Sequence, residues 1–203
     1  MKRSRPPAAV VAIAVLLVVL GACTAEAPVA SNTVPPPATA GERVSLVTLG
    51  GNETVIRGLD ESVNQPWNQQ VFSELPLSAT FANVAARDAT VADGLDEQVP
   101  KALAEQPTLA IVWFGANDAA QRTGTTAFSN RLTSIVQQLQ IGGARVLLIE
   151  RTGRGPDGIG PYLDAVGRVA AATGATLVTI EAHDDLRNPA EHRAIAEAVA
   201  AVL

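Results

Sequence analysis

The residues best placed to do chemistry begin in the stretch "LVTLGGNETV", Leu46 to Val55. An apolar run that ends in two glycines predicts a strand entering a tight turn, where many enzymes hold a nucleophile. The residue after the glycines is Asn52, and a carboxamide has no ionisable group that a neighbouring base could activate. Thr54, two residues further on, carries a hydroxyl and is an alternative nucleophile.

Two other polar groups follow apolar runs. "FGAND" places Asn117 in a compact polar turn, which by itself predicts only the start of a helix. His183 could act as a base, although a surface position at a strand end is the simpler interpretation, and His192 is expected to pack or cap locally. The adjacent side chains of His183 to Asp185 rarely converge on one ion, and no second cluster has ligand spacing. We therefore expect neither a metal nor another cofactor.

The elements that must position these residues alternate between strands and helices. The apolar runs predict five strands, at Val44 to Leu49, Thr80 to Val84, Leu109 to Gly115, 145–150 and Thr176 to Ile180. Helical spacing marks Trp67 to Leu75 and the segments that contain Leu95 to Leu103, Leu132 to Leu139, Ile159 to Ala170 and Ile195 to Val202. The last helix has Asn188 as its N-cap, Pro189 as its first residue and Glu191 two residues later. This alternation predicts an α/β fold, a mostly parallel five-stranded sheet with helices on both faces and a ligand crevice after the strands.

Taken with these surroundings, "FGAND" resembles the G-x-N-D block of the SGNH (GDSL-type) hydrolases, and the resemblance extends over Val44 to Leu203. "VTLGGNET" lies where that family has its G-D-S block, and "NVAARDAT" lies where it has N-x-G-x-S-G-x-T. "DDLRNPAEHRAIAEA" lies where the family reads D-x-x-H-P and then its final helix. The resemblance implies a three-layer flavodoxin-like fold and transfer of an acyl group to water by a Ser, a His and an Asp.

Carried over residue by residue, the resemblance implies an altered site. Asn52 stands at the nucleophile, and Asp88 stands at the glycine whose N–H would bind the oxyanion. Arg187 stands at the catalytic His if one residue is deleted after it, and Leu186 stands there without a gap. Neither of these can act as a base, so only Asn117 and the acidic position, Asp184, match their blocks.

The first residues of the chain predict a targeting signal that is not part of the folded domain. Three basic residues precede an uncharged run of 13 residues, which ends at Leu20, the first residue of "LGAC", Leu20 to Cys23. This segment resembles the lipobox of bacterial lipoproteins, which implies a signal peptide at 1–22 and acylation of Cys23, the only cysteine. Residues 23–42, rich in Pro and Ala, predict a tether, and residues 43–203 the domain. We therefore expect a lipid-anchored protein on the extracytoplasmic face of the cell membrane.

The composition limits the classes of molecule that the chain could bind. Removing Lys2, Arg3 and Arg5 with the signal lowers the formal net charge from −5 to −8, and no basic cluster remains, which argues against nucleic acid. The leading hypothesis is a non-catalytic envelope protein that binds a glycan, an acylated small molecule or a protein in its cleft. The alternatives are an unusual ester hydrolase that uses Thr54 or His183, and a structural envelope protein with no cleft ligand.

Overall fold

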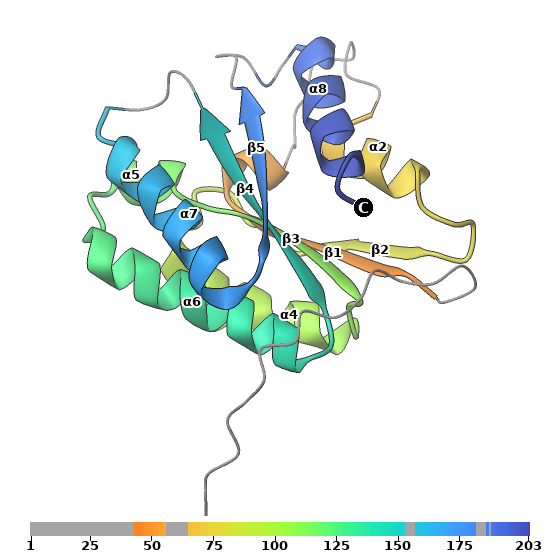
Figure 1. Ribbon diagram of the computed structural model, residues 1–203, viewed down its shortest axis with the longest axis horizontal. Coiled ribbons are helices and arrows are strands. Elements are labelled where there is room, and N and C mark those ends of the chain that lie inside the picture. Colours follow the sequence, from red (N-terminus) through yellow and green to blue (C-terminus); the bar gives the residue numbers. More distant parts are fainter. Residues whose placement is uncertain (1–42, 56–64, 153–156, 182–185, 187) are drawn as a thin grey trace, which may run out of the picture. The chain divides into compact units, whose positions relative to one another are not determined.

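The computed structural model describes residues 43–55, 65–152, 157–181, 186 and 188–203. They form a five-stranded sheet in the order β2-β1-β3-β4-β5, and every neighbouring pair is parallel. The strands are β1 (Ser45–Gly50), β2 (Thr80–Asn83), β3 (Leu109–Trp113), β4 (Arg145–Thr152) and β5 (Thr176–Glu181). All five predicted strands are present, and the parallel three-layer α/β architecture is confirmed (Figure 1).

Helices cover both faces of the sheet (Figure 1). One face packs against α3 (Val91–Asp93), the π-helical turn η1 (Gly94–Gln98), α4 (Val99–Ala104), α6 (Thr125–Ile141) and α7 (Gly160–Thr173). The other face packs against α2 (Trp67–Ser73) and α8 (Pro189–Ala200). Two short helices, α1 (Asn52–Val55) and α5 (Ala116–Ala120), follow β1 and β3 directly.

The central strands are apolar because both of their faces are covered. All residues of β1 and β3 are buried, and their side chains divide between two hydrophobic clusters on opposite sides of the sheet. Alternate residues such as Val47 and Leu49 face the side covered by η1, α4 and α6, whereas Leu46 faces α2 and α8. This double burial predicts the continuous apolar runs seen in the sequence.

Several predicted boundaries are wrong by one or two residues. The first strand begins at Ser45 and continues to Gly50, and the third ends at Trp113, two residues before the predicted end. The helix that begins at Trp67 ends at Ser73, since the chain must turn before Pro76. Gly174 ends α7 in the left-handed conformation, with φ +72°, as a glycine C-cap does.

The strand order decides which loops meet. β1 lies between β2 and β3, so the segments that follow these three strands come together at one end of the sheet. Those segments carry Asn52, Asp88 and Asn117. Residues 52, 88 and 117 are therefore neighbours in space although they lie far apart along the chain.

Candidate functional site

The turn after β1 depends on both of its glycines. Gly50 has φ +156°, and a Cβ there would lie 2.5 Å from the carbonyl oxygen of Trp113 and 2.5 Å from Thr54 Oγ1. A Cβ on Gly51 would lie 2.5 Å from Asn117 Nδ2. The close approach of these neighbours excludes larger side chains, so the double glycine sets the path that leads into α1.

Asn52 is the first residue of α1, and its side chain is held from both ends. Its Nδ2 donates to Asp88 Oδ1 at 3.1 Å and to Asn117 Oδ1 at 3.3 Å. Its Oδ1 accepts from the backbone N–H of Asp88 at 2.8 Å. Because Asp88 offers one donor and one acceptor, only one orientation of the carboxamide satisfies both atoms. Both side-chain N–H groups of Asn52 therefore donate to protein partners.

Asp88 sits in a backbone conformation that glycine adopts more easily. Its φ is +58°, in the left-handed region, where Asp is tolerated better than most other side chains. This conformation points the Asp88 N–H at residue 52, and Gln121 Nε2 donates to the Asp88 carbonyl oxygen at 3.3 Å. The Asp88 N–H, which the resemblance in sequence places at the oxyanion position, donates to the Asn52 carboxamide oxygen.

Asn117 completes the cluster from the start of α5. Its Nδ2 donates to the carbonyl oxygen of Ala89 at 2.9 Å, which fixes its Oδ1 toward Asn52. Next to it, the buried carboxylate of Asp118 accepts from the Val91 N–H at 3.2 and 3.1 Å. Burial raises the pKa of Asp118 to about 6, and the hydrogen bonds from its neighbours only partly oppose this shift.

Gln98 also holds this turn, a role that was not predicted from the sequence. Its side chain is buried in η1, where Oε1 accepts from the Gly50 N–H at 2.9 Å and Nε2 donates to the Gly50 carbonyl at 3.0 Å. The carboxamide thus pairs with both backbone groups of one glycine, as a neighbouring strand would. The available signal was a glutamine on the same apolar helical face as Leu95, Val99 and Ala102.

Thr54, the alternative nucleophile, is wrongly placed for attack. The residue is fully buried, and its hydroxyl lies under Gly50 with no hydrogen-bond partner among the described residues. Its backbone oxygen accepts from Asn68 Nδ2 and Asn83 Nδ2. A substrate could not reach this hydroxyl unless α1 moved, so the role of Thr54 is in packing.

His192 is a structural residue, as expected. It is fully buried in α8, where Nδ1 accepts from the Trp67 N–H at 3.2 Å and Nε2 donates to the Leu186 carbonyl at 2.6 Å. These bonds need the neutral ring, and burial lowers the pKa of His192. Trp67 Nε1 donates to the Glu53 carbonyl at 2.9 Å, so this cluster reaches back to α1.

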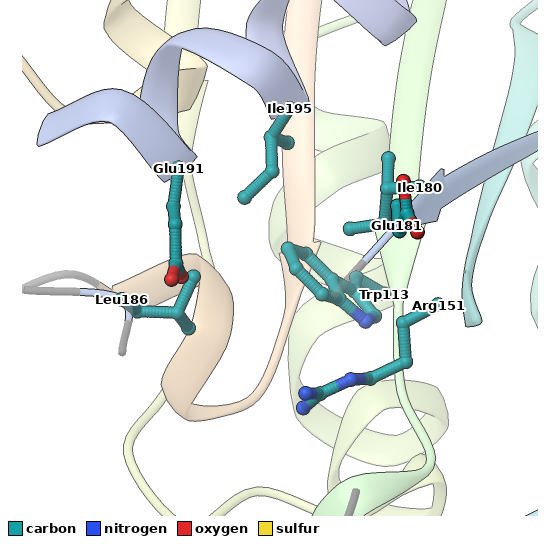
Figure 2. A pocket seen from close by; sticks show the side chains of 7 residues that line it. All are labelled: Trp113, Arg151, Ile180, Glu181, Leu186, Glu191 and Ile195. Carbon is teal, nitrogen blue, oxygen red and sulfur yellow. The ribbon is translucent and has the colours of Figure 1, made fainter. Parts of the chain in front are cut away.

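A pocket opens beside α1 at the same end of the sheet (Figure 2). Its empty space, open solvent included, is about 290 Å³, and its apolar lining consists of Trp113, Ile180, Leu186 and Ile195. Arg151, Glu181 and Glu191 supply charge at the edge. Burial raises the pKa of the neighbouring Glu53, an effect that the positive charge of Arg151 partly offsets.

Several predicted site residues lie outside the described residues: Cys23, His183, Asp184 and Arg187. The start of α8 nevertheless bears on the D-x-x-H-P block. Asn188 is its N-cap, with Oδ1 accepting from the Ala190 N–H at 3.0 Å, and Pro189 is its first residue, both as predicted.

Aligning the proline of the block with Pro189 gives a match without a gap, in which Asp185 takes the acidic position and Asn188 the histidine position. The placement on Asp184 and Arg187 required a deletion. The gap-free register therefore puts Asn188, and not Leu186, at the histidine position, and the Asn188 carboxamide cannot act as a base.

Neither a metal site nor a membrane span is found in the part of the chain that the structure describes. No group of three His, Cys, Asp or Glu side chains there could hold a metal ion. None of the described helices is long and apolar enough to cross a bilayer.

Comparisons with known proteins agree with the fold. The model of the GDSL-like Lipase/Acylhydrolase family matches residues 47–198. The structure of TesA is 26% identical and superposes with a TM-score of 0.62, covering 76% of this chain and 95% of its own.

Two other similar structures share the fold at lower identity. The psychrotrophic esterase EstA from Pseudoalteromonas sp. is 17% identical, with a TM-score of 0.63 and coverage of 76% and 93%. The acetylxylan esterase Axe2 from Geobacillus stearothermophilus is 15% identical, with a TM-score of 0.63 and coverage of 79% and 94%. Among curated proteins, none has a sequence that matches this chain.

Proposed function

Because this chain belongs to the GDSL-like lipase/acylhydrolase family, we propose that it is a lipid-anchored envelope protein that keeps the hydrolase fold for binding and not for catalysis. The observation that carries the proposal is the Asn52 side chain, which is hydrogen-bonded to Asp88 and Asn117 where a hydrolase would hold its nucleophile.

The chemistry of the site supports a non-catalytic role. Acyl transfer needs a nucleophile, a base to take its proton and free donors for the oxyanion. Asn52 supplies no nucleophile, and its Oδ1 already accepts the Asp88 N–H. Neither Arg187 nor Asn188 can serve as a base near neutral pH. The Asp88 carboxylate also adds an acceptor where negative charge would develop, which would oppose an oxyanion.

The pocket beside α1 indicates the kind of ligand. Its apolar lining, with Trp113 at the centre, suits a short acyl group, and Arg151, Glu181 and Glu191 can hydrogen-bond a neutral polar head. Of the three ligand classes considered, an acylated small molecule fits this combination best. A glycan or a protein remains the alternative for the polar surface around Asn52 and Asp88.

The N-terminal sequence supports the location. Acylation of Cys23 after removal of residues 1–22 would anchor the domain to the extracytoplasmic face of the membrane through a tether of about twenty residues. The mature chain is acidic, so the lipid and not surface charge would hold it at an anionic membrane.

The decisive experiment is an ester-hydrolysis assay on the full-length protein, together with labelling by a serine-reactive phosphonate. We expect turnover no higher than that of an Asn117→Ala variant, and no labelling. Turnover well above that control would overturn the proposal and support an unusual ester hydrolase. An Asn52→Ser, Asn188→His double variant tests the inherited geometry, with Asn52→Ser, Arg187→His as its matched control for the other register.

Ligand binding is tested by tryptophan fluorescence, because Trp113 lines the pocket. We expect acetylated sugars and other short acyl compounds to change the emission in a saturable way. A Trp113→Phe variant should lose most of the response, and the buried Trp67, whose ring centroid lies 5.9 Å from that of Trp113, would keep the remainder. An undiminished response in Trp113→Phe would show that binding occurs elsewhere.

A further inference from the structure

The two ends of the sheet differ in what they expose. Because all strands are parallel, the segments that lead into strands lie at one end and the segments that follow them lie at the other (Figure 1). The site around Asn52 belongs to the end where the strands finish. We call the opposite end, where the strands begin, the entry edge.

The most exposed large apolar side chains of the described residues both lie at the entry edge. Leu77 is 108% exposed in the segment between α2 and β2, and Ile141 is 87% exposed at the last residue of α6, just before β4. Neither packs against its own domain, although nearly all other large apolar side chains of these residues do. Contact with water is unfavourable for such side chains, so a partner that covered both of them would be stabilised by the apolar area that it buries.

The described part of the chain begins at the same edge. Arg43 is the first described residue, and it leads directly into the start of β1 at Ser45. The anchor at Cys23 would hold this end of the domain within about 20 residues of the bilayer, a reach of at most roughly 70 Å when fully extended.

We propose that the entry edge rests on the lipid bilayer through Leu77 and Ile141, so that the Asn52 site and its pocket face away from the membrane. This inference rests on the proposed lipid anchor. The orientation directs the site toward molecules of the surrounding envelope or medium and away from the acyl chains of the supporting bilayer. Side-chain contacts of this kind are weak singly, and the anchor makes them effective by raising the local concentration.

The test places an environment-sensitive fluorophore at single positions of the full-length lipidated chain in phosphatidylcholine vesicles with a minor anionic component. Acylation blocks the thiol of Cys23, the only cysteine, so Leu77→Cys, Ile141→Cys and Ala86→Cys each offer one labelling site. Ala86 is the matched control, since it is exposed in the segment after β2 at the opposite end. We expect a lipid-borne quencher to act several-fold more strongly on positions 77 and 141 than on position 86.

A second arm separates this inference from the anchor. The same variants with Cys23→Ser and a hexahistidine sequence in place of residues 1–22 are held on nickel-chelating lipid. The expected pattern in this arm alone would keep the entry edge and overturn the anchor. Equal quenching at all three positions would overturn the entry edge even when the lipidated chain partitions into vesicles. Quenching differences that vanish at low protein-to-lipid ratio would assign the edge to contacts between copies, and would also overturn the inference.

Discussion

Two hydrogen-bonded clusters lie at and around α1, one at the surface of the protein and one buried inside it. Asn52, Asp88 and Asn117 form the first at the surface, with Asn52 and Asp88 exposed and Asn117 partly covered. The second joins the fully buried His192 to the backbone N–H of Trp67, at the start of α2, and to the carbonyl of Leu186, before α8. Both satisfy their hydrogen bonds within the protein, but only the buried cluster lacks water as a replacement partner.

This difference separates residues that could be exchanged during evolution from residues that hold the fold. A surface cluster can change its chemistry at small cost, because water takes over any bond that is lost. A buried cluster cannot, since each unpaired group keeps its full desolvation penalty. A fold can therefore persist while the residues of its surface cluster change.

The largest effect is expected at His192. His192→Leu leaves the Trp67 N–H and the Leu186 carbonyl unpaired inside the protein, which should lower the free energy of unfolding by about 3–5 kcal/mol. Chemical denaturation measures the change, and Arg193→Ala on the exposed face of α8 is the control. A loss below about 1 kcal/mol would mean that the buried cluster is no more important than the surface cluster.

Gln98 should come next, because it holds both backbone groups of Gly50. Gln98→Leu removes a donor and an acceptor from a buried turn and should cost about 2–4 kcal/mol in unfolding free energy. Gln138→Leu, on the exposed face of α6, controls for the general effect of a glutamine-to-leucine change and should stay within about 0.5 kcal/mol. Equal stability of the two variants would show that the turn keeps its shape without Gln98.

A pH-dependent effect of intermediate size is expected at Asp118. Its folded pKa, about 6, lies above that of an unfolded aspartate, about 3.9, so the unfolded chain ionises first as pH rises. The stability linked to this group is complete below pH about 4, falls between pH 4 and 6, and stays lost above pH about 6.

Asp118→Asn removes this titration and keeps an oxygen for the Val91 N–H. Unfolding free energies measured from pH 4 to pH 8 should therefore diverge in favour of the variant as pH rises. Two curves that stay parallel over this range would contradict the raised pKa of Asp118.

The sequence predicts the fold better than the site, for physical reasons. Strands buried on both faces leave long apolar runs, and the Asn188-Pro189 pair is a local helix-start signal, so both are visible without the structure. Helix α1 has only four residues and leaves no periodic pattern. The hydrogen bonds between Gln98 and Gly50 and between His192 and Trp67 join residues that are 48 and 125 positions apart in the sequence. No local pattern encodes such contacts.

The smallest effect is expected at Asn52, and it tests the surface side of the comparison. Asn52→Ala exposes the Asp88 N–H and the Asn117 oxygen to water, which replaces the lost bonds, so the unfolding free energy should fall by about 1 kcal/mol or less. A double-mutant cycle with Asp88→Ala measures the coupling of the pair, expected at about 0.5–1 kcal/mol. The left-handed φ of Asp88 complicates the single Asp88→Ala variant, because Ala is less tolerant of that conformation, but the cycle removes this contribution. A coupling of about 3 kcal/mol would instead place Asn52 among the residues that hold the fold, and its exchange for a serine would then be structurally costly.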